Sequence, residues 1–231
     1  MGIIDWLAGQ LLPLRCRLCA QPGSEGIDLC PACLQAAVRL ETACSRCALP
    51  LPGLAGQAPG LCGACLRVAS PLQACHAAWR YGPTVDVLVQ RFKFGQDLAA
   101  GSVLAALMLR HRPPWLEPGQ VLVPVPLHRA RLAARGYDQA RELVRQLASG
   151  SGLEWRDGLC RRQPTQAQSG LDRAARRRNL RDAFAALPQP PASVVLVDDV
   201  MTTGSTLSAA ARALRRAGVG EVRAWVAART V

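Results

Sequence analysis

The chain has 231 residues, of which 50% are hydrophobic, and a net charge of +12. This length leaves room for one main domain of about 150 residues and a small accessory domain. No apolar run reaches the roughly 18 residues that a membrane-spanning helix needs, and the apolar first residues lack the basic region and cleavage site of a signal peptide. We therefore expect a cytoplasmic protein.

The excess of positive over negative charge lies entirely after residue 66. Residues 1–66 contain four Arg and four acidic residues, whereas residues 129–181 contain 13 Arg and five acidic residues. Such an excess attracts phosphate groups on nucleotides or on nucleic acid. A solvated Arg-rich surface is the alternative, because the chain has 27 Arg, one Lys and much Ala, Leu and Gly, a composition typical of a GC-rich genome.

The first 70 residues predict a small metal-binding domain that includes a short apolar helix over residues 3–14. Two thiolates of one Cys-x-x-Cys motif bind the same ion, and two such motifs complete a tetrahedral site for Zn²⁺. We therefore expect two closed, structural zinc sites in a segment that has few core residues of its own. The eight ligands form four motifs: Cys16/Cys19, Cys30/Cys33, Cys44/Cys47 and Cys62/Cys65.

The pairing of these motifs stays open at the level of sequence. Sequential pairing gives two consecutive ribbons, and cross-braced pairing also fits the spacing. Redox-active pairs are disfavoured because the βαβ context of such motifs is missing here. Two cysteines remain, Cys75 and Cys160. Cys75 and His76 lie in an apolar, strand-like run and are predicted to be core or surface residues and not ligands.

From residue 71 onward, strand-like and helix-like segments alternate. We expect strands at 74–81, 121–125, near 159, at 194–197 and at 221–228. Helices are expected around 85–92, at 98–110, at 137–147 and at 207–217. Such alternation predicts a parallel α/β sheet. Ligands of such sheets bind outside the carboxyl ends of the strands.

The most informative segment is residues 194–207. Four apolar residues precede two carboxylates, Asp198 and Asp199, and a small-residue loop then opens a helix. The loop amides, the hydroxyls and the helix N-terminus suit a phosphate, whereas the carboxylates suit sugar hydroxyls or Mg²⁺. Together they indicate a phosphoribosyl ligand, and no Gly-Lys-Ser/Thr of a Walker A loop is present. The loop residues are Thr202, Thr203, Gly204, Ser205 and Thr206.

Two further segments carry candidate anion-binding residues. The first is the proline-stiffened loop after the strand at 121–125, with Arg129, Arg135 and Gly136; a rigid connector with surface arginines is the alternative. The second runs from Arg161 to residue 179 and includes Arg173 and Arg176. Its polar run without apolar periodicity fits a flexible lid. A single-strand binding edge is less favoured, because the stretch has no aromatic residue on which bases could stack.

The strand, paired acids and Thr-Thr-Gly-x-Thr loop resemble the signature of type I phosphoribosyltransferases. The resemblance implies that Asp198 and Asp199 hold the ribose hydroxyls of phosphoribosyl pyrophosphate (PRPP), which binds with Mg²⁺. It also implies that residues 202–206 hold the 5-phosphate. The loop with Arg129, Arg135 and Gly136 would then take the pyrophosphate, and the lid segment would close over the substrate.

Nearly the whole chain resembles ComF-type proteins. The shared features, in order, are the double zinc ribbon, Phe-Lys-Phe at 92–94, Val-Pro-Val-Pro-Leu-His at 123–128, Arg-Gly-Tyr-x-Gln-Ala at 135–140, the Gln/Arg/Asn stretch and Asp-Asp-Val-x-Thr-Thr-Gly at 198–204. The resemblance implies a double zinc ribbon in residues 1–70 and a phosphoribosyltransferase-like domain in residues 71–231. One departure is Asp138, where the family usually has Asn.

Two functions are compatible with this resemblance. The first is transfer of a phosphoribosyl group to an unknown acceptor. The second is a non-catalytic PRPP sensor, or a module that binds single-stranded DNA or a helicase. In either case the resemblance implies a role in natural competence and in the handling of transforming single-stranded DNA. Lys93, the only lysine, is interpreted as a solvated helix end, with a ligand contact as the alternative.

Overall fold

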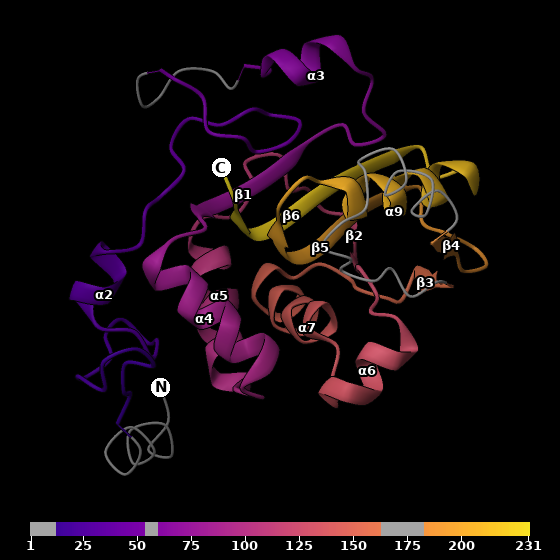
Figure 1. Ribbon diagram of the computed structural model, residues 1–231. Helices are drawn as coiled ribbons and strands as arrows, with labels where there is room; N and C mark the ends of the chain where they lie inside the picture. Colours follow the sequence, from indigo (N-terminus) through magenta and orange to yellow (C-terminus); the bar gives the residue numbers. More distant parts are fainter. Residues whose placement is uncertain (1–12, 54–59, 163–182) are drawn as a thin grey trace, which may run out of the picture.

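A computed structural model describes residues 13–53, 60–162 and 183–231, and its centre is a four-stranded sheet (Figure 1). The strand order is β1-β6-β5-β2, and every neighbouring pair is parallel. This arrangement confirms the predicted parallel α/β sheet. The strands are β1 (Cys75–Arg80), β2 (Val121–Pro124), β5 (Ser193–Met201) and β6 (Glu221–Arg229).

Helices cover both faces of the sheet, which explains why its strands read as continuous apolar runs. One face carries α4 (Pro83–Phe94), α5 (Leu98–Arg110) and α7 (Gln139–Ser151) (Figure 1). The other face carries α9 (Ser205–Arg216) and a small antiparallel pair, β3 (Leu159–Arg161) and β4 (Phe184–Ala186). Along β5, Val195 and Val197 join the first core, while Val194 and Leu196 join the second.

Side-chain caps decide where the helices begin. Helix α5 starts at the predicted residue because the Asp97 carboxylate accepts a hydrogen bond from the Ala100 amide at 3.1 Å. Helix α7 starts at Gln139, two residues later than its apolar spacing suggests, because Asp138 caps it. Tyr137 therefore lies outside the helix, where the centroid of its ring is 5.7 Å from that of the Phe92 ring.

Three further features differ from the sequence expectation. The strand expected near residue 159 is β3, which pairs antiparallel with β4 outside the parallel sheet. Strand β5 continues through both carboxylates to Met201, because β6 pairs with it along the whole length. The loop after β2 contains a short helix, α6 (Arg129–Arg135), which begins at a His128 cap and ends at Gly136 with a φ of 82°. Its run of Arg and Ala lacks apolar periodicity, so the pattern did not reveal it.

The two zinc ribbons lie on different parts of the domain (Figure 1). The first ribbon, residues 13–37, contains α2 (Pro31–Gln35) and packs beside α4 and α5. The second ribbon, residues 43–53 and 60–67, contains α3 (Gly63–Arg67) and lies beside the edge strand β1. Between the ribbons, Leu40 donates to the Ala78 carbonyl and Arg80 donates to the Val38 carbonyl, both at 2.9 Å.

Two expectations about organisation remain outside these observations. The helix expected over residues 3–14 lies almost entirely outside the described residues. The boundary between residues 70 and 71 stays a prediction. Among the described helices, none has the length and apolar character needed to cross a bilayer.

Candidate functional site

The eight motif cysteines form two separate clusters. The Sγ atoms of Cys16, Cys19, Cys30 and Cys33 lie within 4.8 Å of one another, and so do those of Cys44, Cys47, Cys62 and Cys65. Each cluster therefore combines two consecutive motifs, so the pairing is sequential and not cross-braced. Cys75 is buried outside both clusters, with its Sγ 3.5 Å from the sulfur of Met201.

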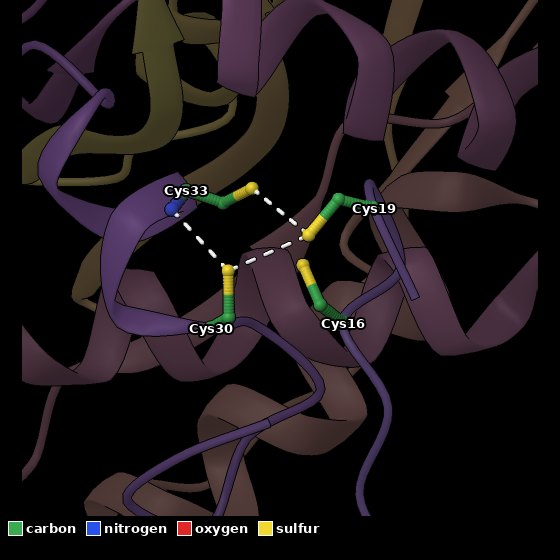
Figure 2. Close-up of side chains that lie close together, drawn as sticks. All are labelled: Cys16, Cys19, Cys30 and Cys33. Atoms are coloured by element: carbon green, nitrogen blue, oxygen red, sulfur yellow. Dashed lines mark hydrogen bonds between the residues drawn. The ribbon is translucent and has the colours of Figure 1, made fainter. Parts of the chain in front are cut away.

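Figure 2 shows the four sulfurs of the first cluster pointing toward a common centre. Cys19 Sγ lies 3.6 Å from the Sγ atoms of both Cys30 and Cys33. A tetrahedral site with Zn–S bonds of about 2.3 Å places its sulfurs about 3.8 Å apart. The Cys33 amide also donates to Cys30 Sγ at 3.5 Å, so Cys30 is both a cluster member and the N-cap of α2. These sulfurs fit Zn²⁺ without further ligands.

The second cluster repeats this geometry. Cys47 Sγ lies 3.7 Å from Cys62 Sγ, and the Cys62 amide donates to Cys44 Sγ at 3.3 Å. The Arg46 guanidinium donates to the Cys65 carbonyl at 2.7 Å and joins the two halves of the ribbon. Because both clusters supply four thiolates, both fit closed, structural zinc sites.

The two carboxylates lie near the carboxyl end of β5. Asp199 is only 5% exposed, and its Oδ1 lies 2.8 Å from Lys93 Nζ. The interpretation of Lys93 as a solvated helix end is therefore wrong. Asp198 Oδ1 accepts a hydrogen bond from the Asp199 amide at 2.9 Å. Burial, together with the neighbouring Asp199 charge, raises the pKa of Asp198 to about 7, while Lys93 opposes this shift.

The loop after β5 has the geometry of an anion site. Gly204 has a φ of 72°, a left-handed backbone that favours glycine, and a Cβ there would lie 2.3 Å from the terminal carbon of Met201, which would have to move. The N-cap residue of α9 is Gly204, which offers no side-chain cap, and the Thr203 hydroxyl accepts a hydrogen bond from the Ser205 amide at 3.4 Å. The partial positive charge of the helix N-terminus also attracts an anion. The Thr203 and Ser205 hydroxyls lie 2.8 Å apart beside it. Thr202 is exposed and Thr206 is half-buried.

A basic pocket of about 460 Å³ lies between the loop after β2 and strand β3. It brings together Arg129 and Arg161, two of the predicted anion-binding residues, and adds Arg162. Burial and the charge of Arg131 lower the pKa of Arg161, and the charge of Asp198 opposes this shift. The pocket is lined by Pro126, Leu127, His128, Arg129, Leu159, Cys160, Arg161 and Arg162.

The other predicted anion-binding residues lie elsewhere. Arg135 donates to Gln139 Oε1 at 2.8 Å and stacks over the Phe94 ring at 5.0 Å. Gly136 supplies the left-handed backbone that ends α6. Neither lines the pocket. Arg173 and Arg176 lie outside the described residues.

Asp138, the departure from the family pattern, has a structural role. Its Oδ2 accepts a hydrogen bond from the Leu127 amide at 3.0 Å, and its Oδ1 accepts one from the Arg141 amide at 3.2 Å. The side chain thus joins the pocket loop to the start of α7. An Asn side chain could accept only one hydrogen bond in this arrangement, because its second terminal atom is an NH₂ donor.

Sequence models of two families match this chain. The model of the double zinc ribbon domain matches residues 7–66, and that of the phosphoribosyl transferase domain matches residues 190–230. Among solved structures, the glutamine PRPP amidotransferase from B. subtilis, complexed with ADP and GMP, is 22% identical with a TM-score of 0.37. That likeness covers 55% of this chain and 26% of the amidotransferase chain.

Full-length relatives give the stronger comparison. The DNA utilization protein YhgH from Escherichia coli K12 is 32% identical, over 95% of this chain and 99% of its own. Competence protein F from Haemophilus influenzae is 33% identical, over 87% and 90% of the two chains. Competence protein ComFC from Streptococcus pneumoniae is 26% identical, over 87% and 80%. The chain therefore belongs to the ComF family, in which a double zinc ribbon precedes a phosphoribosyltransferase-like domain.

Proposed function

We propose that this chain binds PRPP together with Mg²⁺ at the junction of β5 and α9. Asp198 and Asp199 hold the ribose hydroxyls, and residues 202–206 hold the 5-phosphate. One observation carries the proposal: a loop of hydroxyl residues and the N-terminus of α9, with Gly204 as its N-cap residue, follow two adjacent carboxylates on the same strand. A phosphate donor set and a hydroxyl acceptor set thus lie a few residues apart, which matches a phosphorylated sugar.

The basic pocket extends this proposal to the pyrophosphate. Arg129 and Arg161 line it, and guanidinium groups bind phosphate oxygens in a bidentate manner. Arg135, Gly136, Arg173 and Arg176 remain proposed contributors. In a phosphoribosyl transfer the nucleophile belongs to the acceptor, so the chain would act by positioning the reactants and stabilising charge.

We further propose that the chain acts in the cytoplasm on the use of incoming DNA. The relatives named for DNA utilization and for competence support this role. A second candidate function is a non-catalytic one, in which the chain senses PRPP or binds single-stranded DNA or a competence helicase. The basic pocket favours it, because three arginines and the Cys160 segment form a surface that suits any phosphate chain.

Calorimetric titration of the zinc-loaded protein with PRPP and MgCl₂ tests the proposal. We expect micromolar binding that the double substitution Asp198→Asn and Asp199→Asn abolishes. The matched control is Asp157→Asn, since Asp157 is an exposed acid paired with Arg141; it should leave the affinity unchanged. Binding that survives the double substitution would contradict the site.

A second titration separates the two candidate functions. Fluorescence anisotropy with labelled single-stranded DNA compares the wild type with Arg161→Ala plus Arg162→Ala. DNA binding that this change abolishes, in a protein that binds no PRPP at millimolar concentration, would replace the first function by the second. PRPP binding followed by release of pyrophosphate in a screen of acceptors would establish transfer.

A further inference from the structure

Lys93 is the only lysine of the chain and contacts one of the two proposed ribose-binding carboxylates. It lies in the last turn of α4, and its side chain is 23% exposed while that of Asp199 is 7% exposed. The two residues are far apart in sequence, so the contact depends on the tertiary fold, which brings the last turn of α4 to Asp199 of β5. Elsewhere the chain uses arginine for its cations, which suggests that a compact point charge is needed here.

The aromatic neighbours of Lys93 fix its position. Phe92 is fully buried, and its ring contacts Tyr137 at 5.7 Å. Phe94 lies on the other side of Lys93, and Arg135 stacks over its ring at 5.0 Å. Two aromatic contacts thus hold the end of α4 against residues 135–137. The Lys93 ammonium is thereby directed at Asp199 by the buried packing of Phe92 and by the contact of Arg135 with the exposed Phe94.

The ammonium changes what the acid pair can bind. Two adjacent carboxylates carry two negative charges, which is a starting point for a divalent cation site. The Lys93 ammonium, 2.8 Å from Asp199, cancels one of these charges and occupies one coordination position. Asp198 also titrates near neutral pH. The remaining oxygens can accept hydrogen bonds from hydroxyls, which require no full negative charge.

We propose that Lys93 is a positioning residue that fills the cation position beside Asp199, so that the acid pair binds sugar hydroxyls and rejects a free divalent cation. This inference rests on the proposed function, in which the ligand is a phosphoribosyl group. The Mg²⁺ of the complex then enters with the diphosphate of the ligand and not through the carboxylates. An ammonium has three donors, so two remain for ligand oxygens after the contact with Asp199.

Titration of the zinc-loaded protein with Mn²⁺ alone, followed by electron paramagnetic resonance, tests the inference. Mn²⁺ prefers oxygen ligands and does not compete for thiolates. We expect the wild type and Lys93→Arg, which keeps the charge, to bind no Mn²⁺ at micromolar concentration. Lys93→Gln should bind Mn²⁺ at least about tenfold more tightly than the wild type, and adding Asp199→Asn should remove this binding again. Equal Mn²⁺ affinity of the wild type and Lys93→Gln would overturn the inference.

The wild type provides a second, independent outcome if Lys93→Gln leaves Asp199 unpaired and does not fold. Micromolar Mn²⁺ binding by the wild type, lost on substitution of Asp198 and Asp199 by Asn, would overturn the inference without any Lys93 variant. PRPP titrations separate this failure from that of the proposed function. A wild type that binds no PRPP contradicts the function, whereas PRPP binding together with a wild-type Mn²⁺ site contradicts only the role of Lys93.

Discussion

The two zinc ribbons share a motif and a cluster geometry, but they attach to the α/β domain in different ways. The first ribbon contributes Ile27 and Leu29 to the same core as α4 and α5, and Leu29 is fully buried. Salt bridges surround this contact, between Arg17 and Asp97 at 2.7 Å and between Arg110 and Glu25 at 2.6 Å. The first ribbon is therefore part of the hydrophobic core.

The second ribbon attaches through polar contacts near the proposed ligand site. Arg229, which is buried, donates from Nε to the Cys47 carbonyl and from Nη1 to the Met201 carbonyl, both at 3.1 Å. Met201 directly precedes the loop of residues 202–206, and its terminal carbon lies close to Gly204. A ribbon attached by packing should control stability, whereas one attached by hydrogen bonds beside a loop should control the shape of that loop.

Removal of one zinc ligand from each ribbon should produce the largest difference between the two ribbons. Cys19→Ser should disturb the first site and the α4/α5 core together, because structural zinc contributes on the order of 10 kcal/mol to the folding of such segments. Cys65→Ser should lower the zinc content by the same amount but leave the core of α4 and α5 folded. Thermal unfolding and zinc analysis of both variants check this. Equal losses of Tm would contradict the comparison.

Truncation of Leu29 should separate packing from metal binding in the first ribbon. Leu29→Ala removes a fully buried side chain, so the free energy of unfolding should fall by about 2–5 kcal/mol. The zinc content should not change, because the four thiolates remain. Leu66→Ala is the matched control in the second ribbon, since Leu66 is 70% exposed. A similar loss of stability in the control would argue against the packing role of the first ribbon.

Substitution of Arg229 should show whether the second ribbon supports the loop of residues 202–206. Arg229→Ala leaves the Cys47 and Met201 carbonyls without these donors, which should lower the free energy of unfolding by about 1–3 kcal/mol. Affinity for PRPP should fall as well, because the loop after Met201 loses its support. Arg17→Ala, which removes the half-buried ion pair of the first ribbon with Asp97, should leave the affinity unchanged. The reverse order of effects would contradict the assignment.

The pH dependence of stability should arise from Asp198, beside the loop of residues 202–206, and not from the first ribbon. The pKa of Asp198 is raised to about 7 in the folded chain from its ordinary value of 3.8. The folded state then binds more protons than the unfolded state between these values, so stability falls as pH rises through that window. Asp198→Asn should therefore gain stability over the wild type between pH 6 and 8. Parallel curves of Tm against pH for the two proteins would disprove the shift.

Local sequence predicted the parts of the fold that depend on short-range patterns. Helix α5, the parallel strands and the four zinc motifs follow from apolar spacing, caps and Cys-x-x-Cys turns. The salt bridge of Lys93 with Asp199 could not be predicted in this way, since the two residues are distant in sequence. The Phe-Lys-Phe triplet was its one local signal. Arg229 gave no signal, because its partners are backbone carbonyls that any sequence supplies.

The candidate site was likewise predicted only where its residues are consecutive. Residues 198–206 form one strand, loop and helix start, so their proximity follows from the chain itself. The pocket joins Arg129 to Arg161 and Arg162 across two elements. Charge density indicated that arginines would gather in this region, but the choice of Arg129 over Arg135 depends on α6. That helix turns Arg135 toward Gln139 and Phe94.

The smallest predicted difference between the two ribbons lies in the turns of their Cys-x-x-Cys motifs. In each ribbon the residue after the second cysteine is an alanine with a left-handed backbone, with a φ of 63° at Ala20 and 53° at Ala48. Glycine adopts this conformation without the cost of about 1 kcal/mol that an L side chain incurs. Ala20 is exposed, so Ala20→Gly should raise the free energy of unfolding by up to about 1 kcal/mol.

At Ala48 the same substitution should have almost no net effect. Ala48 is 1% exposed and belongs to the second core, so Ala48→Gly also loses a buried methyl group that contributes about 0.8 kcal/mol. The two effects oppose each other, whereas at Ala20 only the backbone effect remains. Urea unfolding of both variants at fixed zinc concentration measures the difference directly. Equal stabilisation at both positions would mean that the Ala48 methyl contributes nothing to the core, and the second ribbon would then be attached by its hydrogen bonds alone.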